Sequence, residues 1–113
     1  MKSYTSIEQS KKLAEFLSLE SADMYYVDDI SAEFGRGWHS QHIPCWSLAS
    51  LLSVLPSIIT RKGKIRFLTL EKAGAYNLYY KSPDRLDELW ETKEDVVDAC
   101  YEMILKLHEQ KLL

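Results

Sequence analysis

Two histidines and a cysteine stand at intervals of three residues in the segment His39-Ser40-Gln41-His42-Ile43-Pro44-Cys45. Imidazole nitrogens and thiolates are zinc ligands, and a histidine can also act as the base for a cysteine nucleophile. Cys45 comes just before an expected helix, whose N-terminal dipole would lower the pKa of the thiol. A structural zinc site, however, needs four ligands, and no second paired cluster stands elsewhere. We therefore expect no catalytic residue, no metal and no cofactor, and keep a Cys-His hydrolase or metal-binding protein centred on Cys45 as an alternative.

The same segment is flanked by two tryptophans, Trp38 and Trp46. Aromatic side chains concentrate at the centres of protein interfaces, so two tryptophans on one exposed surface would anchor a partner. We therefore expect a protein partner or self-association through this segment. The candidate binding residues are Trp38, His39, His42 and Trp46.

The basic cluster of the chain lies in the hairpin region 61–81. Its cations are Arg61, Lys62, Lys64 and Arg66, and the neighbouring aromatic residues are Phe67, Tyr79 and Tyr80. Aromatic side chains beside cations can stack the bases of a single strand. Aromatic residues also build strands, however, and basic residues keep hairpins soluble. We expect no nucleic-acid partner, and keep a single-stranded nucleic-acid binder through this hairpin as an alternative.

Composition limits the classes of protein. The chain has 113 residues, 46% of them hydrophobic, and its 14 Lys and Arg against 17 Asp and Glu give a net charge of −3. These values exclude disordered, collagen-like and coiled-coil chains. The negative net charge argues against a protein whose main function is to bind nucleic acid. A chain of this mass buries roughly two-thirds of its unfolded surface, enough for one core. We expect a single domain over residues 1–113.

The chain shows no apolar run near the ~20 residues that span a bilayer, and its first residues lack an apolar signal stretch. We therefore expect a cytoplasmic protein with no membrane partner and with two reduced cysteines.

Capping and apolar periodicity predict the elements of the first half. Thr5 and Glu8 have capping-box spacing, which indicates a helix that begins there and ends near 17–19. The aromatic and β-branched run 23–27 predicts a strand, and the polar loop after it includes a second short strand at 38–43. Leucines at the i, i+3, i+4 and i+7 positions of 48–55 predict a helix that stops before Pro56.

A hairpin of strands 64–71 and 75–81 is predicted around Gly74 in a left-handed conformation. Its expected register pairs Leu68 with Leu78, Leu70 with Tyr76 and Arg66 with Tyr80. This places four side chains on the core face: Leu68, Leu70, Tyr76 and Leu78.

The second half ends in the longest amphipathic stripe of the chain, which predicts a helix over 93–110 with a capping box at Thr92 and Asp95. The fold class is therefore α+β: a small antiparallel sheet built on a β-hairpin, packed by N-terminal, central and C-terminal helices. Apolar stripes of the central and C-terminal helices are expected to dock on the hairpin, with little apolar material left for a cleft. No nucleophile elbow, phosphate-binding loop, dinucleotide fingerprint or EF-hand loop is present, so we expect a non-enzymatic protein.

Three stretches of the chain resemble a group of small uncharacterised bacterial proteins. The stretches are Ser10–Leu17 with Ser21–Met24, Ile43–Leu48 with Leu51-Leu52 and Leu55-Pro56, and Asp98–Ile104 ending in Leu107-His108. These proteins occur in gut-type bacteria, often in prophage or mobile-element neighbourhoods. The resemblance implies a bacterial, cytoplasmic, phage-related context and an accessory or interaction role, and it supplies no catalytic residue.

Overall fold

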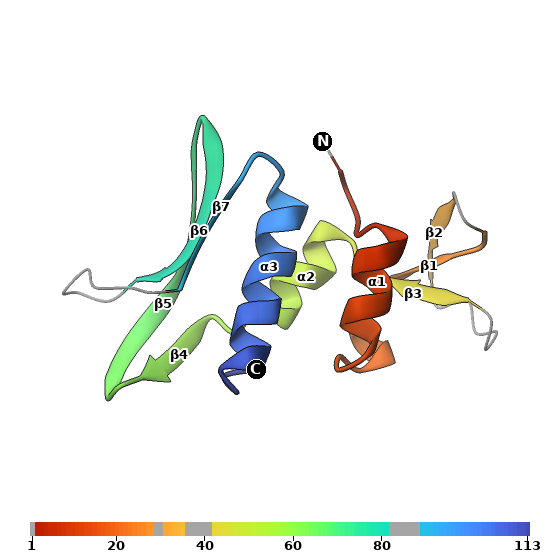
Figure 1. Cartoon of the computed structure of the whole chain (residues 1–113). Helices are drawn as coiled ribbons and strands as arrows, with labels where there is room; N and C mark the ends of the chain where they lie inside the picture. The colour runs from red at the N-terminus through yellow and green to blue at the C-terminus, as the bar shows by residue number, and fades with distance from the viewer. Residues whose placement is uncertain (1, 29–30, 36–41, 82–88) are drawn as a thin grey trace. The chain divides into compact units, whose positions relative to one another are not determined.

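The computed structural model describes residues 2–28, 31–35, 42–81 and 89–113. The chain forms two compact units, Met1–Val54 and Leu55–Leu113, and each is described by itself. The described residues contain three α-helices and two antiparallel sheets (Figure 1), which confirms the α+β class. The single domain over 1–113 stays a prediction, as does the docking of the central helix on the hairpin.

The first unit combines two helices, a 3-10 turn and a three-stranded sheet. Its elements are α1 (Ile7–Ala14), η1 (Leu19–Ser21), β1 (Met24–Tyr26), β2 (Ala32–Phe34), β3 (Ile43–Cys45) and α2 (Leu48–Val54). The strands lie in the order β2-β1-β3, and α1 packs against β3. The buried side chains Met24, Tyr26 and Cys45 form a small core, so this unit has an interior of its own.

Helix α1 begins one residue later than its capping pattern predicts. Ser6 is the N-cap, and it forms a reciprocal capping box with Gln9. Thr5 does not cap the helix because its buried hydroxyl bonds to Ser10 and to the backbone of Trp46. The helix also ends at Ala14 rather than at 17–19.

The strands of this unit are only partly those predicted from the sequence. The predicted strand 23–27 is confirmed as β1, and α2 ends before Pro56 as expected. β2 was predicted as loop. The strand expected at 38–43 begins only at Ile43, in β3, and residues 36–41 lie outside the described part.

The second unit is a four-stranded antiparallel sheet with one long helix (Figure 1). Its elements are β4 (Ile58–Arg61), β5 (Lys64–Ala73), β6 (Ala75–Lys81), β7 (Trp90–Lys93) and α3 (Val96–Glu109). The strand order is β4-β5-β6-β7, so the predicted hairpin forms the centre of the sheet. Helix α3 packs against β6 and β7 with an apolar stripe that includes Cys100, Met103 and Leu107, all fully buried.

The register of the central hairpin differs from the predicted one by two residues. Leu70 pairs with Leu78, Leu68 pairs with Tyr80, and Gly74 alone lies between the last pair, with φ +76°. A shift of two residues keeps every side chain on its expected face, because side chains alternate along a strand. Leu78 is buried as predicted, but Leu70 sits near the hairpin end and is 44% exposed.

The start of α3 also differs from the prediction. Residues 90–93 form β7, so the helix begins at Val96 with Asp95 as its N-cap, whose carboxylate accepts from the Val97 N–H. Lys106 of α3 donates to the Trp90 carbonyl at 2.6 Å and pairs with Glu91 at 2.7 Å, which ties the edge strand β7 to the helix. Among the described residues, no helix has the length and apolar character that a membrane crossing requires.

Candidate functional site

The sequence-predicted binding residues do not form one exposed surface among the described residues. Trp38 and His39 lie outside the described part. His42 is half-buried and stacks on Tyr25, with ring centroids 4.9 Å apart. Trp46 is fully buried, and its indole Nε1 donates to Ser21 Oγ at 3.0 Å. The expectation that Trp46 is an exposed anchor is therefore wrong, because its ring fills the interior; binding roles for the other three residues stay predictions.

Cys45 lies in the interior at the end of β3, three residues before the first residue of α2. Its Sγ lies 3.6 Å from Thr5 Oγ1 and 3.5 Å from the Thr5 carbonyl oxygen. Burial raises the pKa of the thiol, and hydrogen bonds from Thr5, Ser10 and Tyr26 only partly oppose this effect. A buried thiol with a raised pKa is a poor nucleophile and a poor metal ligand. Within residues 2–28, 31–35, 42–81 and 89–113, no three His, Cys, Asp or Glu side chains gather to hold a metal ion.

The polar groups around Cys45 form a network centred on Thr5. The Thr5 hydroxyl bonds to Ser10 Oγ at 2.7 Å and accepts from the Trp46 N–H at 3.2 Å. Its carbonyl accepts from the Tyr26 hydroxyl at 2.6 Å, and its N–H donates to the Trp46 carbonyl at 3.0 Å. Each of these polar groups around Thr5 thus has a partner inside the protein, which is the arrangement of a structural network.

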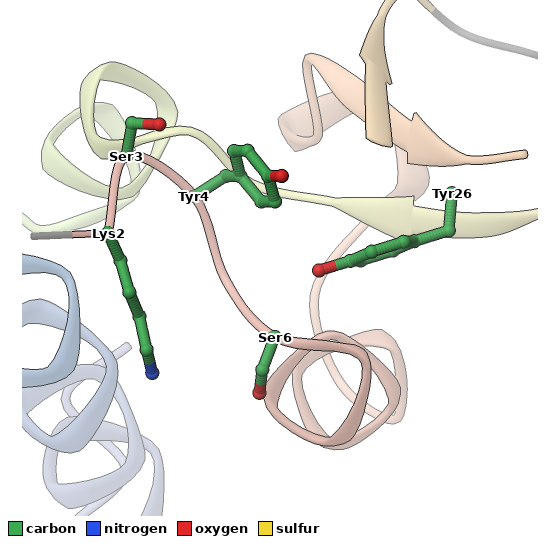
Figure 2. Close-up of a pocket in the computed structure, with 5 residues that line it drawn as sticks. All are labelled: Lys2, Ser3, Tyr4, Ser6 and Tyr26. Atoms are coloured by element: carbon green, nitrogen blue, oxygen red, sulfur yellow. The ribbon is translucent and has the colours of Figure 1, made fainter. Parts of the chain in front are cut away.

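A pocket of about 270 Å³ lies beside this network (Figure 2). It is lined by Lys2, Ser3 and Tyr4 of the segment before α1, by Ser6, and by Tyr26 of β1. The Tyr26 hydroxyl already donates to the Thr5 carbonyl, and burial raises its pKa to about 12. It therefore stays protonated at neutral pH and cannot serve as a base.

A second pocket, of about 440 Å³, lies next to the first turn of α2 and includes Glu20, Asp23 and Ser50. Asp23 accepts from the Ser47 N–H at 2.9 Å and from the Ser47 hydroxyl. Partial burial opposes ionisation of this carboxyl, but the hydrogen bonds from Ser47 and Ser50 outweigh it and lower the pKa of Asp23. Both carboxylate oxygens are thus engaged in holding the start of the helix.

The outer face of the four-stranded sheet is the surface of the second unit that is not packed on α3. Because side chains alternate along each strand, the pairing register assigns its members. They are Ile58 and Thr60 of β4, Ile65, Phe67, Thr69 and Glu71 of β5, Asn77, Tyr79 and Lys81 of β6, and Trp90 and Thr92 of β7. Four large apolar side chains on this outer face are about half exposed: Ile58 (53%), Ile65 (55%), Phe67 (51%) and Trp90 (52%). These exposed apolar side chains make the outer face the candidate site of the second unit.

Hydrogen bonds and ring stacking fix the aromatic part of the outer face. Tyr79 and Trp90 stack with centroids 5.3 Å apart and an interplanar angle of 29°. The Trp90 indole donates to Thr92 Oγ1, which donates to Asn77 Oδ1, both at 2.8 Å. The Tyr79 hydroxyl donates to Glu71 at 2.6 Å. These contacts hold the rings before any partner arrives, which lowers the entropy cost of binding.

The outer face carries little charge. Its charged members are Glu71 and Lys81, whose formal charges cancel. The basic cluster of the sequence lies elsewhere: Arg61, Lys64 and Arg66 alternate with the outer-face residues along β4 and β5, and Arg66 is buried. Tyr80, expected beside that cluster, is also fully buried. The stacking surface predicted for nucleic acid is therefore reduced to Phe67 and Tyr79.

Sequence reasoning singled out Phe67 and Tyr79 as aromatic residues of the hairpin but missed Ile58, Ile65 and Trp90 as parts of the same surface. The strands β4 and β7 that carry Ile58 and Trp90 were not predicted. Comparison with known proteins adds no assignment: no family model, no curated protein and no solved structure matches the chain.

Proposed function

We propose that this protein is a non-enzymatic interaction module that binds another protein through the outer face of its four-stranded sheet. The observation that carries the proposal is the group of half-exposed apolar side chains, Phe67 and Trp90 among them, on a face held rigid by hydrogen bonds. The partner surface that fits this face is apolar at its centre and poor in charge. An accessory role in a bacterial mobile element, as the resemblance implies, is part of the same proposal and stays a prediction.

The chemistry of the outer face favours protein over nucleic acid. Protein interfaces are depleted in charge at the core and enriched in aromatic residues, with a polar rim. Ile58 and Ile65 add aliphatic surface, and the threonines Thr60 and Thr69 add neutral polar groups. Nucleic-acid binding depends on cations that neutralise phosphates, and the charged members of this face are one lysine, Lys81, and one glutamate, Glu71.

The first unit supports a structural rather than a catalytic reading. Cys45 is buried with a raised pKa, and the carboxylate of Asp23 is engaged by Ser47. General acid-base or nucleophilic catalysis needs a reactive group within reach of a substrate. Neither Cys45 nor Asp23 provides one.

In-cell photocrosslinking tests the proposal. A photoreactive phenylalanine analogue replaces Phe67, and in a matched control it replaces Leu70, which lies on the same strand, on the opposite face, and is 44% exposed. We expect position 67 to give a discrete protein adduct and position 70 to give much less. The captured protein is then identified and its binding reconstituted with purified components, where Trp90→Ser should weaken it.

Equal crosslinking at positions 67 and 70 would contradict the proposal, because the outer face would then have no preference for a partner. Adducts at position 67 that contain only RNA or DNA would replace protein binding with the single-stranded nucleic-acid alternative. The proposal would also be contradicted if the captured protein bound the Trp90→Ser variant as tightly as the unchanged chain.

A further inference from the structure

We infer that the protein bound at the outer face is a second copy of this chain, with the two sheets packed face to face. The inference rests on the proposed function and names its partner. Three features of the second unit support it: the apolar area of the face, its charge balance, and the layer that the fold leaves open.

The apolar area matches that of a weak symmetric dimer. A large side chain presents ~150–250 Å², so four that are half exposed leave roughly 400 Å² uncovered on each copy. Two copies would bury about twice that from these four alone, and the polar rim would bring the total toward the ~1,200 Å² at the low end of specific interfaces. An interface of this size fits association on the order of micromolar rather than nanomolar affinity.

The charge balance of the outer face allows two copies to meet. The chain as a whole has a net charge of −3, which opposes self-association through most of its surface. On the outer face Glu71 and Lys81 cancel, so two such faces approach without net repulsion. A highly charged partner, by contrast, would find little to complement on this face.

The layers of the second unit leave one face of the sheet open. Within the second unit, helix α3 packs on β6 and β7 from one side, and Ile58, Ile65, Phe67 and Trp90 on the outer face keep about half of their surface exposed. Two sheets pack at about 10 Å with interdigitated side chains, which is how a second copy would bury these residues. Such a contact is isologous and closes at two copies.

Sedimentation equilibrium of the purified full chain tests the inference. Over a concentration series from micromolar to millimolar, the mass should rise from one chain to two and then stay constant. Phe67→Ser and Trp90→Ser should each raise the dissociation constant roughly tenfold or more, as expected for aromatic anchors at an interface centre. Leu70→Ser, the matched control on the opposite face of β5, should leave it unchanged. Far-UV circular dichroism confirms that each variant folds, and Ile65→Lys replaces Phe67→Ser should the latter unfold.

A chain that stays monomeric over the whole series overturns the inference. A dimer that survives Phe67→Ser and Trp90→Ser, or that Leu70→Ser disrupts equally, overturns it as well, because the contact then lies elsewhere. These failures are distinct from failure of the proposed function. If the chain is a monomer that still crosslinks a different protein at position 67, the proposal of an interaction module stands and only the inference of a second copy is overturned.

Discussion

Thr5→Val removes one buried hydroxyl while keeping the branched shape of the side chain. In the folded protein that hydroxyl accepts from the Trp46 N–H at 3.2 Å and bonds to Ser10 Oγ at 2.7 Å. The substitution leaves both groups without this partner in the interior. A buried polar group without a partner costs about 1–3 kcal/mol, so we expect a loss of roughly 2–4 kcal/mol of unfolding free energy.

Ser10→Ala is the matched control for this prediction. It removes the 2.7 Å bond but leaves the Thr5 hydroxyl paired with the Trp46 N–H, so the expected loss is only about 0.5–1.5 kcal/mol. The double variant should lose less than the sum of the two, because both changes remove the same bond.

Urea denaturation followed by far-UV circular dichroism measures these free energies, with unchanged m-values as a check on two-state behaviour. A Thr5→Val cost below about 0.5 kcal/mol, or one equal to that of Ser10→Ala, would refute the network argument. The environment that keeps Cys45 protonated would then need another explanation.

Four further predictions concern the buried thiols, Asp23 and Gly74. Cys45 and Cys100 should resist thiol reagents at pH 8 until the protein unfolds, because burial raises both pKa values, that of Cys100 to about 12; rapid labelling of the native protein would contradict this. Both thiols are harder to ionise in the folded protein than in the unfolded chain. Their contribution to the free energy of unfolding is therefore fully present below about pH 8.5, the pKa of an unfolded thiol, and is lost as the pH rises toward the folded pKa values. Alkaline titration should therefore destabilise the protein. Asp23→Ala should cost about 1–2 kcal/mol at neutral pH through loss of the bonds to Ser47. Because the folded pKa of Asp23 is lowered, this difference should shrink as the pH falls from about 4 toward that lowered value; a pH-independent cost measured in urea would contradict it. Gly74→Ala should cost about 1–2 kcal/mol because φ is +76° there, and an unchanged melting temperature would refute the assigned turn.

The helices were the most predictable part of the fold, because periodic leucines and long apolar stripes identify them. The spacing of Leu48, Leu51 and Leu55 gave α2, and the stripe from Val96 to Leu107 gave α3. Their exact starts were less predictable. Residues 90–93 pair with β6 as a strand, and this pairing cannot be read from a local capping pattern at Thr92.

Of the strand pairings in the two sheets, only the β5–β6 hairpin was predicted. The hairpin and the left-handed Gly74 were recognised, but the register was off by two because either pairing keeps the same faces. The strands β2, β4 and β7 are three or four residues long. They are too short for alternating apolar and polar residues to predict them, and they form because they pair with neighbouring strands.

The candidate site illustrates the same limit. A tryptophan near a loop can be an anchor or a core residue, and the two outcomes differ by which neighbours surround it. Trp46 is buried and its indole N–H donates to Ser21, whereas Trp90 stacks on Tyr79 and stays half exposed. Sequence reasoning chose Trp46 because it is close to Trp38 and the histidines along the chain. In the fold, however, Trp46 is not on an exposed surface.

The claim that two copies of the chain meet through the outer face of the sheet is tested most directly by a residue-resolved dilution series in nuclear magnetic resonance. We predict that the Trp90 indole N–H and the signals of Ile58 and Phe67 shift together with concentration and fit one dissociation constant, while those of α3 stay in place. Signals that do not move at any concentration, or that move instead on α3 or in the first unit, would contradict the face-to-face contact between two copies.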